Sequence, residues 1–365
     1  MYESSQQSVC LLHNVAAPYR LPIFEKVGKN VDLTVILCGR LPNHRTWSEE
    51  VQPESYELKH FRATSVGPLS FVPRLLLYLI FHDFDEIIVN DKHELLPSTL
   101  MVLFVSLFCQ FSITTWSERN ETRWKRSRRS TDSTVKHFVR RLWYYVDDLC
   151  HRVVYGRSDR IISFSEDSSN YVRQRIESFD KITISPQSMP ETCLEPVPDE
   201  QTNNVQVSND KTTVIYVGQL IERKGVSTLI KSMKQLDSNE YELLIAGKGP
   251  EKEILQRHAS QVDSYIGFLG YICEKEKAAY MSQCDILVLP TLHDAWGLVI
   301  NEALHYGTPA VTTAAAGGRM IIPDDYIASP NDPTSLADAI KQAEESGSVT
   351  ENPPTEKMVS AILCK

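Results

Sequence analysis

The stretch DILVLPTLHDAWGLVINEALHYGTPAVTT, residues 285–313, decides how the chain is expected to fold. A short apolar run at 285–289 predicts a buried strand, the apolar periodicity of 298–306 predicts a helix, and 310–313 predicts a second strand. A strand, a helix and a strand in close succession form the repeating unit of a parallel sheet. The segment therefore predicts an α/β domain whose ligands meet the carboxyl ends of its strands.

The same alternation extends outward on both sides of this stretch. In the C-terminal half it predicts further strands at 213–217, 241–246 and 266–269, and further helices at 226–236, 251–258, 274–283 and 334–344. In the N-terminal half it predicts strands at 9–15, 31–37, 86–89, 112–116, 160–164 and 181–185, and helices at 19–29, 98–111 and 134–155. Several strands are apolar on both faces, which is typical of parallel sheets covered by helices. The fold class is therefore α/β, with two doubly wound, Rossmann-like domains.

The pattern stops between the two halves. Residues 186–211 are polar and acidic and contain four prolines, a composition that predicts an interdomain linker. The predicted domains are 1–185 and 212–345, followed by a C-terminal tail at 346–365. A chain of 365 residues is long enough to give each of two domains its own core.

Composition excludes some classes of protein. The net charge of −9 argues against nucleic acid as a partner. The eight cysteines form no C-x-x-C pair and no histidines cluster near them, so no metal site is predicted. The polar start, residues 1–8, lacks the apolar region of a signal peptide, and together with unpaired cysteines this predicts a cytoplasmic location.

The loop and helix of the opening stretch contain the first candidate site. The amides of Gly297, Leu298 and Val299 would lie at the helix start, where backbone N–H groups bind phosphate. Glu302 would tilt back toward that end of the helix and reach a ribose, while Asp294 would reach a sugar. The alternative is a structural role, with Asp294 capping the helix and Glu302 facing solvent.

Two further loops follow strands of the same half. Gly218 ends a strand, and the loop after it delivers Arg223 and Lys224, two cations suited to a diphosphate. The segment AGKGP, residues 246–250, places Gly249 in a tight turn after the next strand. Taken singly, the first loop also fits a solvated basic loop and the second an ordinary turn. Their agreement in one domain favours a ligand site.

These stretches resemble the family 4 glycosyltransferases of the GT-B fold. The resemblance rests on VGQLIERKGVSTLIKSM, LLIAGKGPEKEILQ, IGFLGYICEKEKAAYMSQCDILVLP and DAWGLVINEALHYGTPAVTT, and is strong over about residues 212–320. It places the family's two acidic positions, which have seven residues between them, at Asp294 and Glu302, and its diphosphate-binding loop at Gln219, Arg223 and Lys224. Weaker likeness in the N-terminal half includes TTWSE, residues 114–118, which resembles the segment facing the donor sugar and implies a catalytic role for Glu118.

The resemblance implies a retaining transferase that uses a nucleotide-diphosphate sugar. The N-terminal domain would then serve the acceptor, a glycan or a lipid-linked molecule, and the C-terminal domain the donor, with no metal or other cofactor required. Asp294 and Gln219 depart from the family, which has Glu and Arg at those positions. The alternatives are a nucleotide-sugar epimerase of the same fold and a nucleotide-binding partner subunit without catalysis.

A basic region in the N-terminal half suggests where the protein acts. Residues 119–160 hold twelve Lys or Arg and five Asp or Glu, a local charge of +7, which leaves −16 on the remainder. The segment Arg123–Arg129 precedes a predicted helix whose Phe138, Leu142, Tyr145, Leu149 and Val153 recur at helical spacing. The apolar stripe could face the sheet. Alternatively, the basic segment and helix could rest on an anionic membrane at its inner face, or the basic segment could bind the phosphates of a lipid-linked acceptor.

Overall fold

The computed structural model describes residues 6–39, 53–66, 69–119, 134–194, 196, 207–208 and 210–363, with the side chains of 65–66 and 134–140 left aside. The basic segment Arg123–Arg129 lies outside the described residues. The chain forms two compact units. One comprises Met1–Ser185 with Thr355–Lys365, and the other comprises Pro186–Pro354.

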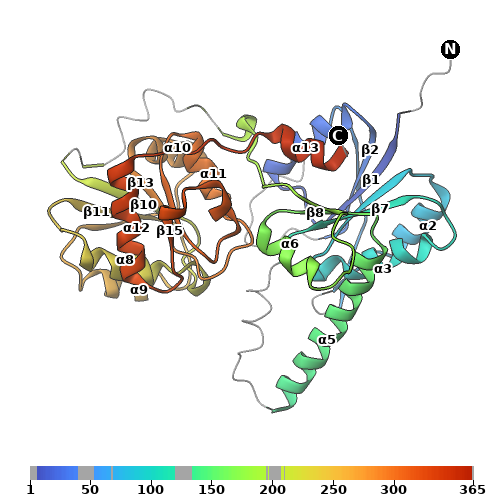
Figure 1. The fold of residues 1–365 in the computed structure, drawn as a ribbon, viewed down its shortest axis with the longest axis horizontal. Helices are drawn as coiled ribbons and strands as arrows, with labels where there is room; N and C mark the ends of the chain where they lie inside the picture. Colours follow the sequence, from blue (N-terminus) through green and yellow to red (C-terminus); the bar gives the residue numbers. More distant parts are fainter. Residues whose placement is uncertain are drawn as a thin grey trace. The chain divides into compact units, whose positions relative to one another are not determined.

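The N-terminal unit is built on a sheet whose neighbouring strands are all parallel, in the order β3-β2-β1-β6-β7-β8-β9 (Figure 1). Its strands are β1 (Ser8–His13), β2 (Asp32–Leu37), β3 (Glu57–His60), β6 (Glu86–Asn90), β7 (Ser112–Ser117), β8 (Arg160–Ser163) and β9 (Ile182–Ile184). Two short strands, β4 (Thr64–Val66) and β5 (Leu69–Phe71), form a separate antiparallel pair. The helices are α1 (Leu21–Gly28), α2 (Pro73–Phe81), α3 (Leu96–Val105), α5 (Thr134–Arg157), α6 (Glu166–Arg173) and α13 (Thr355–Leu363).

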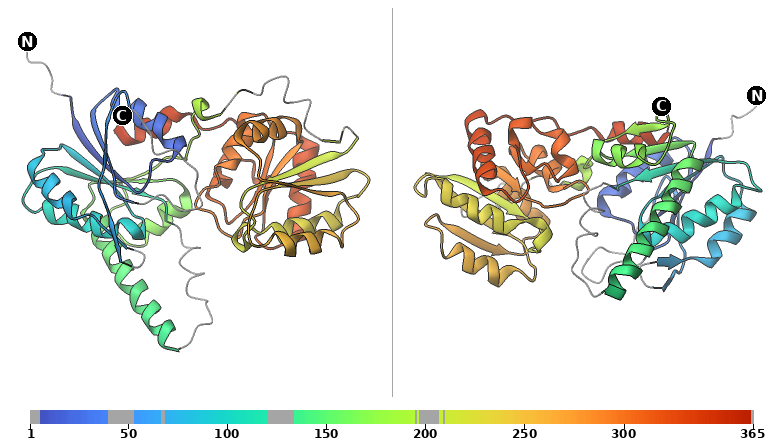
Figure 2. Two further views of the ribbon diagram at one scale, coloured as in Figure 1. Left: turned by 180° about the vertical axis from the view of Figure 1, so that it is seen from behind. Right: turned by 60° about the horizontal axis from the view of Figure 1, so that its bottom comes forward.

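The C-terminal unit has a second parallel sheet, in the order β12-β11-β10-β13-β14-β15. Its strands are β10 (Thr212–Val217), β11 (Tyr241–Ala246), β12 (Ile266–Gly270), β13 (Ile286–Leu289), β14 (Ala310–Thr313) and β15 (Ile327–Ala328). Helices α8 (Val226–Ser232), α9 (Lys252–Ala259) and α12 (Pro333–Ser346) cover one face, and α10 (Glu274–Gln283) and α11 (Val299–His305) cover the other (Figure 2). The prediction of two doubly wound, parallel α/β domains is confirmed.

Short 3₁₀ helices join several of these elements. They span Pro18–Arg20, His93–Leu95, Glu191–Cys193, Glu222–Lys224, Met233–Gln235, Gly317–Ile321 and Asp324–Tyr326. None of the described helices is long and apolar enough to cross a membrane.

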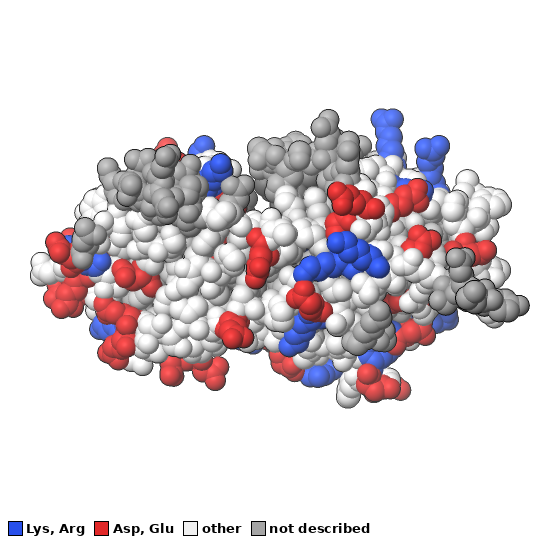
Figure 3. Space-filling view, turned by 90° about the horizontal axis from the view of Figure 1, so that it is seen from above, with Lys and Arg blue, Asp and Glu red and all other residues white. Residues whose placement is uncertain are grey.

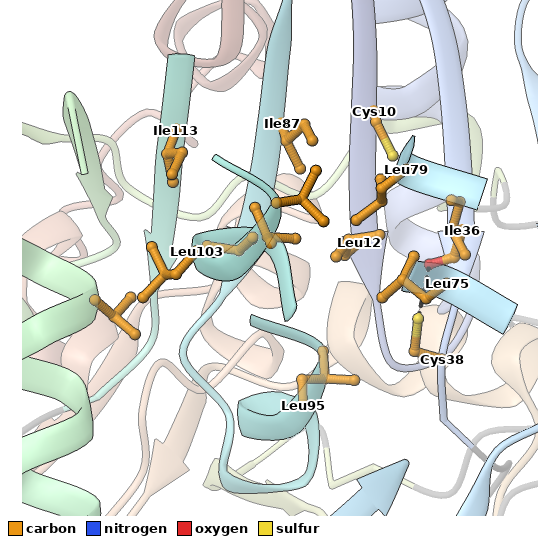
Figure 4. Close-up of a cluster of buried hydrophobic side chains, with 14 of the residues drawn as sticks. Cys10, Leu12, Ile36, Cys38, Leu75, Leu79, Ile87, Leu95, Leu103 and Ile113 are labelled. Atoms are coloured by element: carbon orange, nitrogen blue, oxygen red, sulfur yellow. Dashed lines mark hydrogen bonds between the residues drawn. The ribbon is translucent and has the colours of Figure 1, made fainter. Parts of the chain in front are cut away.

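The core of the N-terminal unit shows why its strands are apolar on both faces. Alternate residues of adjacent strands, such as Cys10 and Leu12 of β1 and Ile36 of β2, point to one face, where Leu75 of α2 and Leu103 of α3 pack on them (Figure 4). Buried side chains of α5 and α6 complete this layer. Residues of opposite parity, such as Leu11 and Val35, are equally buried because the sheet is also covered on its other side.

The structure differs from the prediction at the C-terminal segment 346–365, which was expected to be a tail. Residues Thr355–Leu363 form helix α13, which belongs to the N-terminal unit and packs against α1. Met358, Val359 and Ile362 lie on one face of the helix and are buried. Arg160 donates hydrogen bonds to the carbonyls of Ala361 and Ile362, which satisfies the end of the helix.

The structure also differs at the start of the predicted linker 186–211. Gln187 and Ser188 are buried, and the carbonyl of Gln187 accepts a hydrogen bond of 3.0 Å from Asn301 Nδ2 of α11. Proline blocks regular structure here, but the backbone is held by a side chain of the C-terminal unit. Most of the segment between 195 and 209 lies outside the described residues.

The apolar stripe of helix α5 faces away from the sheet, so the interpretation in which it packs on the sheet is wrong. Leu142, Tyr145 and Leu149 are half or more exposed, at 54%, 70% and 50%. The buried face instead presents Asp147 and His151 to the sheet. Asp147 accepts hydrogen bonds of 2.7 and 3.2 Å from the two guanidinium nitrogens of Arg119, which also donates to the carbonyl of Asp91.

The described surface carries many acidic side chains. On the face drawn in Figure 3, acidic side chains lie scattered over much of the surface, as expected for a net charge of −9.

Candidate functional site

The strand order of the C-terminal unit fixes where a ligand can bind. Strand β10 has β11 on one side and β13 on the other, so the connections leaving β10 and β13 diverge to opposite faces of the sheet. In open α/β sheets, ligands bind outside the carboxyl ends of the strands at this point of reversal. The loops that follow β10 and β13 are the ones predicted to form the site.

These two loops are bonded to each other along their backbones. The carbonyl of Arg223 accepts hydrogen bonds from the amide of Leu292, at 2.8 Å, and from the hydroxyl of Thr291, at 3.0 Å. Gly225 adopts a φ of 68°, and a Cβ there would lie 2.1 Å from the carbonyl oxygen of Pro290. Only glycine therefore allows the loops to approach this closely.

The contact brings the predicted cations to the predicted acid. Lys224 Nζ lies 2.5 Å from Asp294 Oδ2, and Arg223 Nη1 lies 3.6 Å from the same oxygen. Arg223 Nη1 also donates to the carbonyl of His293 at 2.7 Å. Burial alone would raise the pKa of Asp294, but Lys224 and then Arg223 outweigh it, so the pKa lies below its ordinary value. Asp294 is therefore a carboxylate at neutral pH, flanked by two cations.

A structural cap does not explain Asp294. The residue at the N-cap of α11 is Leu298, and no side chain caps this helix. The Asp294 backbone is held separately, because its amide donates to the Ala315 carbonyl at 3.0 Å and its carbonyl accepts from the Gly317 amide at 3.2 Å. The carboxylate is thus free of a capping role, which favours the ligand interpretation over the structural one.

The glycines predicted to bind the nucleotide lie where neighbouring loops meet. A Cβ on Gly249 would lie 2.2 Å from the Leu220 carbonyl oxygen, and one on Gly218 would lie 2.7 Å from the hydroxyl of Tyr216. That hydroxyl donates a hydrogen bond of 2.8 Å to the carbonyl of Gln219, whose side chain is exposed. The structure therefore joins the loops after β10 and β11, as their positions at adjacent strand ends predict.

The start of α11 is shifted from the prediction. The helix begins at Val299, with Leu298 as its N-cap in helical dihedral angles, and Gly297 before it has a φ of 98°, outside the helical range. Within the described residues, no hydrogen-bond acceptor is assigned to the amides of Gly297, Leu298 and Val299. The three predicted phosphate-binding amides thus remain together, although the helix behind them is short.

Glu302 is buried, so the alternative in which it faces solvent is wrong. Its side chain is only 10% exposed, and Oε2 lies 3.0 Å from Nζ of Lys277, a residue of α10. Lys277 also pairs with Glu274 at 2.6 Å. Burial raises the pKa of Glu302, and Lys277 offsets only part of that rise.

We expect the Lys277→Met variant to lose stability in a pH-dependent way. A carboxyl whose pKa is raised by folding binds its proton more tightly in the folded state, so its contribution to stability declines as the pH rises above the ordinary value of 4.5. Removing Lys277 raises the pKa of Glu302 further and extends this decline toward neutral pH. The loss at pH 8 should reach about 3 kcal/mol, as for other broken buried ion pairs.

Thermal unfolding of the wild type and the variant between pH 5 and pH 8 measures this effect. The gap in melting temperature should widen as the pH rises, and the double variant Lys277→Met/Glu302→Gln should narrow it at pH 8. A gap that is constant across this range would show that Lys277 does not act through the charge of Glu302.

Two features of this unit could not have been found by inspecting motifs. Lys277 stands in the charged run EKEKAA, where only an i,i+3 pair with Glu274 is visible. Trp296 donates from Nε1 to Asn301 Oδ1 at 2.7 Å, which ties the loop after β13 to α11. Both contacts join residues that sequence spacing alone does not bring together.

Glu118 lies at the end of β7 in the N-terminal unit. Its carboxylate pairs with Arg20 at 2.5 Å and with Lys92 at 3.3 Å. Burial alone would raise its pKa, but Lys92 and then Arg20 outweigh burial, so the pKa of Glu118 lies below its ordinary value. Glu118 is therefore ionised at neutral pH and acts as a hydrogen-bond acceptor.

Comparison with known families identifies the C-terminal half of the chain. Residues 198–358 match the model of the family described as glycosyl transferases group 1. The chain thus carries a domain of this glycosyltransferase family, and the resemblance predicted from the sequence is confirmed.

Curated relatives carry the same kind of domain. A phosphatidyl-myo-inositol mannosyltransferase of Mycobacterium leprae is 31% identical over 135 residues, which are 35% of this chain and 36% of the relative. A 2-deoxystreptamine N-acetyl-D-glucosaminyltransferase of Niallia circulans is 26% identical over 149 residues, 39% of this chain and 38% of the relative. These matches span little more than a third of the relatives' own lengths.

Solved structures are similar over nearly the whole chain. A sucrose-phosphate synthase of Thermosynechococcus elongatus gives a TM-score of 0.68 at 17% identity, covering 98% of this chain and 94% of the other. HepE of Anabaena in complex with UDP gives a TM-score of 0.68 at 15% identity, covering 98% and 95%. At such low identity the likeness establishes the two-domain fold and leaves the substrates open.

Proposed function

We propose that this protein is a retaining glycosyltransferase that moves a sugar from a nucleotide-diphosphate sugar to a glycan or lipid-linked acceptor. The observation that carries the proposal is the group formed by Arg223, Lys224 and Asp294 at the point where the C-terminal sheet reverses its strand order. Buried Glu302 lies one helical turn beyond the loop that holds Asp294. The arrangement offers cations for a diphosphate and carboxylates for hydroxyls.

The cations act on the leaving group. Breaking the bond between sugar and diphosphate places negative charge on the diphosphate and positive character on the sugar. Lys224 and Arg223, together with the amides of Gly297, Leu298 and Val299, stabilise the first of these charges. In a front-face reaction, the departing diphosphate itself takes the proton of the acceptor hydroxyl, so no covalent nucleophile is needed.

The remaining residues position the donor. Gly218, Gln219 and Gly249 form the surface that the nucleotide approaches, and Glu302 accepts hydrogen bonds from the ribose hydroxyls. Asp294 orients the sugar. Glu118, ionised at neutral pH, keeps its proposed catalytic role as an acceptor of hydrogen bonds from hydroxyl groups. The cationic loop supplies the charge that a metal ion would supply elsewhere, so no metal or other cofactor belongs to the proposal.

The named relatives support the choice of substrates. The group 1 match and the mannosyltransferase of Mycobacterium leprae favour sugar transfer, and the Anabaena structure binds UDP. Two Rhizobium meliloti relatives are named as lipopolysaccharide core biosynthesis glycosyltransferases, which favours a lipid-linked acceptor. We place the protein in the cytoplasm, attached to the inner face of an anionic membrane through Arg123–Arg129 and the helix that follows.

A panel of nucleotide sugars tests the proposal. Incubation with each donor and a mixed acceptor preparation should release one nucleotide diphosphate, and the product should keep the anomeric configuration of the donor. Conversion of the donor with no acceptor present would indicate an epimerase. Nucleotide binding without release of sugar would indicate a partner subunit.

Glu302→Ala should weaken donor binding without unfolding the protein. Hydrogen bonds to a charged group contribute about 1.5–3 kcal/mol each, so the dissociation constant should rise by at least about tenfold. Calorimetric titration measures it, and exposed Glu253 of α9, changed to Ala, is the matched control. Equal affinity of wild type and Glu302→Ala would remove Glu302 from the nucleotide site.

A further inference from the structure

A pocket of about 440 Å³ opens within the N-terminal unit. Its wall is formed by apolar side chains of β5, α2, α3 and α5, among them Leu69, Leu76, Met101, Phe104, Trp143 and Cys150. The lining includes one carboxylate, Asp147, which is already engaged by Arg119 at 2.7 Å. The pocket therefore offers packing surface and almost no hydrogen bonds, and it suits a hydrocarbon.

The pocket lies within a larger exposed apolar surface. On α5, the exposed residues Leu142, Tyr145 and Leu149 recur every three or four positions and form one stripe. Helix α3, which packs against α5, exposes Phe104, and the turn after it exposes Phe108. Figure 2 shows α5 and its neighbours α2 and α3 on the same side of the N-terminal sheet. Soluble monomers rarely leave contiguous apolar surface of this kind without a partner.

The helix is held in this orientation by polar contacts. Arg119 joins Asp147 of α5 to the Asp91 carbonyl at the end of β6, and His151 Nδ1 donates to the Asp147 carbonyl at 2.6 Å. Turning the apolar stripe toward the sheet would break this buried network and leave charges without partners, at a large cost. The exposed stripe is thus built into the fold.

Charge distinguishes between the two partners that such a surface suits, a second copy of the chain and an anionic membrane. Residues 119–160 carry +7 and the remainder of the chain −16, from their sequence counts. In a two-fold dimer through α5, whose residues 134–157 include five Lys or Arg and two Asp, each helix would meet the same excess of positive charge on its mate and repel it. An anionic bilayer instead attracts this part of the chain and repels the acidic remainder. Arg141, exposed next to Leu142, lies where a lipid headgroup would meet the apolar stripe.

We propose that α5 lies in the headgroup region of an anionic phospholipid bilayer and that the pocket between α3 and α5 holds a hydrocarbon chain of that bilayer. The inference rests on the membrane attachment proposed above, but not on the transfer reaction. It adds a lipid-binding site distinct from the donor site and replaces attachment by charge alone with attachment by charge and apolar insertion.

Fluorescence quenching by lipids tests the pocket directly. Vesicles of equal parts phosphatidylcholine and phosphatidylglycerol with brominated acyl chains should quench part of the tryptophan emission. Trp143→Phe should remove most of the quenched part, because Trp143 lines the pocket. Trp116→Phe, at a buried tryptophan of the same unit, should not. Protein that binds these vesicles and is quenched equally with and without Trp143 overturns the pocket assignment, and so does protein that does not bind them.

Flotation tests the apolar stripe with a matched pair of variants. Leu149→Ser should lower the partition onto these vesicles by about tenfold, the effect of withdrawing one leucine-sized side chain from an apolar phase. Ile254→Ser removes a similarly exposed apolar residue of α9 in the other unit and should leave the partition unchanged. Equal loss in both variants overturns the assignment of the stripe. A dimer in sedimentation without vesicles that dissociates in Leu149→Ser overturns the proposal in favour of a second copy.

The results separate this inference from the proposed function. Vesicle binding with the expected Trp143 dependence, together with no release of nucleotide diphosphate from any donor, would refute the transferase and leave the lipid site intact. Release of nucleotide diphosphate by protein that does not bind anionic vesicles would refute the lipid site and leave the transferase intact.

Discussion

Replacing Lys224 with methionine is expected to lower kcat by about a hundredfold, the effect of removing one preorganised charge-stabilising group. Methionine keeps the length of the side chain, which is 15% exposed, and removes only the charge. The ammonium group meets more negative charge as the diphosphate departs than it meets in the bound donor. The loss should therefore fall mainly on kcat, with a smaller change in KM.

Steady-state kinetics with the donor identified from the panel provides the measurement. Lys231→Met is the matched control, because Lys231 is exposed on α8 in the same unit and lies outside the site loops. The control should keep wild-type kcat and KM. A Lys224→Met variant that also keeps wild-type kcat would mean that the loop does not contact the leaving group.

The loops of the site could be predicted because local chemistry determines them. Strand β11 occupies the predicted range 241–246 because its six residues are all buried in the centre of a sheet, with glycine immediately after them. The order of strands then follows from the rules of doubly wound sheets, and it brings Arg223 and Lys224 beside Asp294.

Features that depend on what covers a surface could not be predicted in this way. The periodicity of α5 correctly identifies an apolar stripe, but periodicity alone does not show whether the sheet or a membrane covers that stripe. The orientation is decided by Arg119, which lies outside the helix and draws Asp147 inward. For the same reason Glu302 looks like a surface residue in sequence, since its partner Lys277 belongs to another helix.

Short elements were missed for a related reason. Strand β3, Glu57–His60, has the polar sequence ELKH, and only its pairing with β2 makes it a strand. Helix α13 follows two prolines, which suggest a tail, and forms because Met358, Val359 and Ile362 find a surface on the N-terminal unit. Tertiary contact supplies in both cases what local propensity does not.

The Asp294→Ala variant should lose activity by about a hundredfold or more, because the sugar is no longer held in the reactive geometry. The variant should still fold, since the loop is fixed by the backbone bonds of residue 294 to Ala315 and Gly317 rather than by its carboxylate. Asp294→Glu should retain or raise activity, because the family has the longer acid at this position and the two cations remain beside it.

The comparison of kcat/KM between these two variants, with melting temperature measured alongside, decides the role of Asp294. A carboxylate that orients the donor predicts a large difference between alanine and glutamate at similar stability. A carboxylate that only neutralises Lys224 and Arg223 predicts a different pattern, in which Asp294→Ala lowers the melting temperature and Asp294→Glu restores it with little change in kcat/KM in either variant. Equal loss of activity in both variants would show that the length of the side chain matters more than its charge. Asp294 would then be a structural residue of the loop rather than a sugar-binding one.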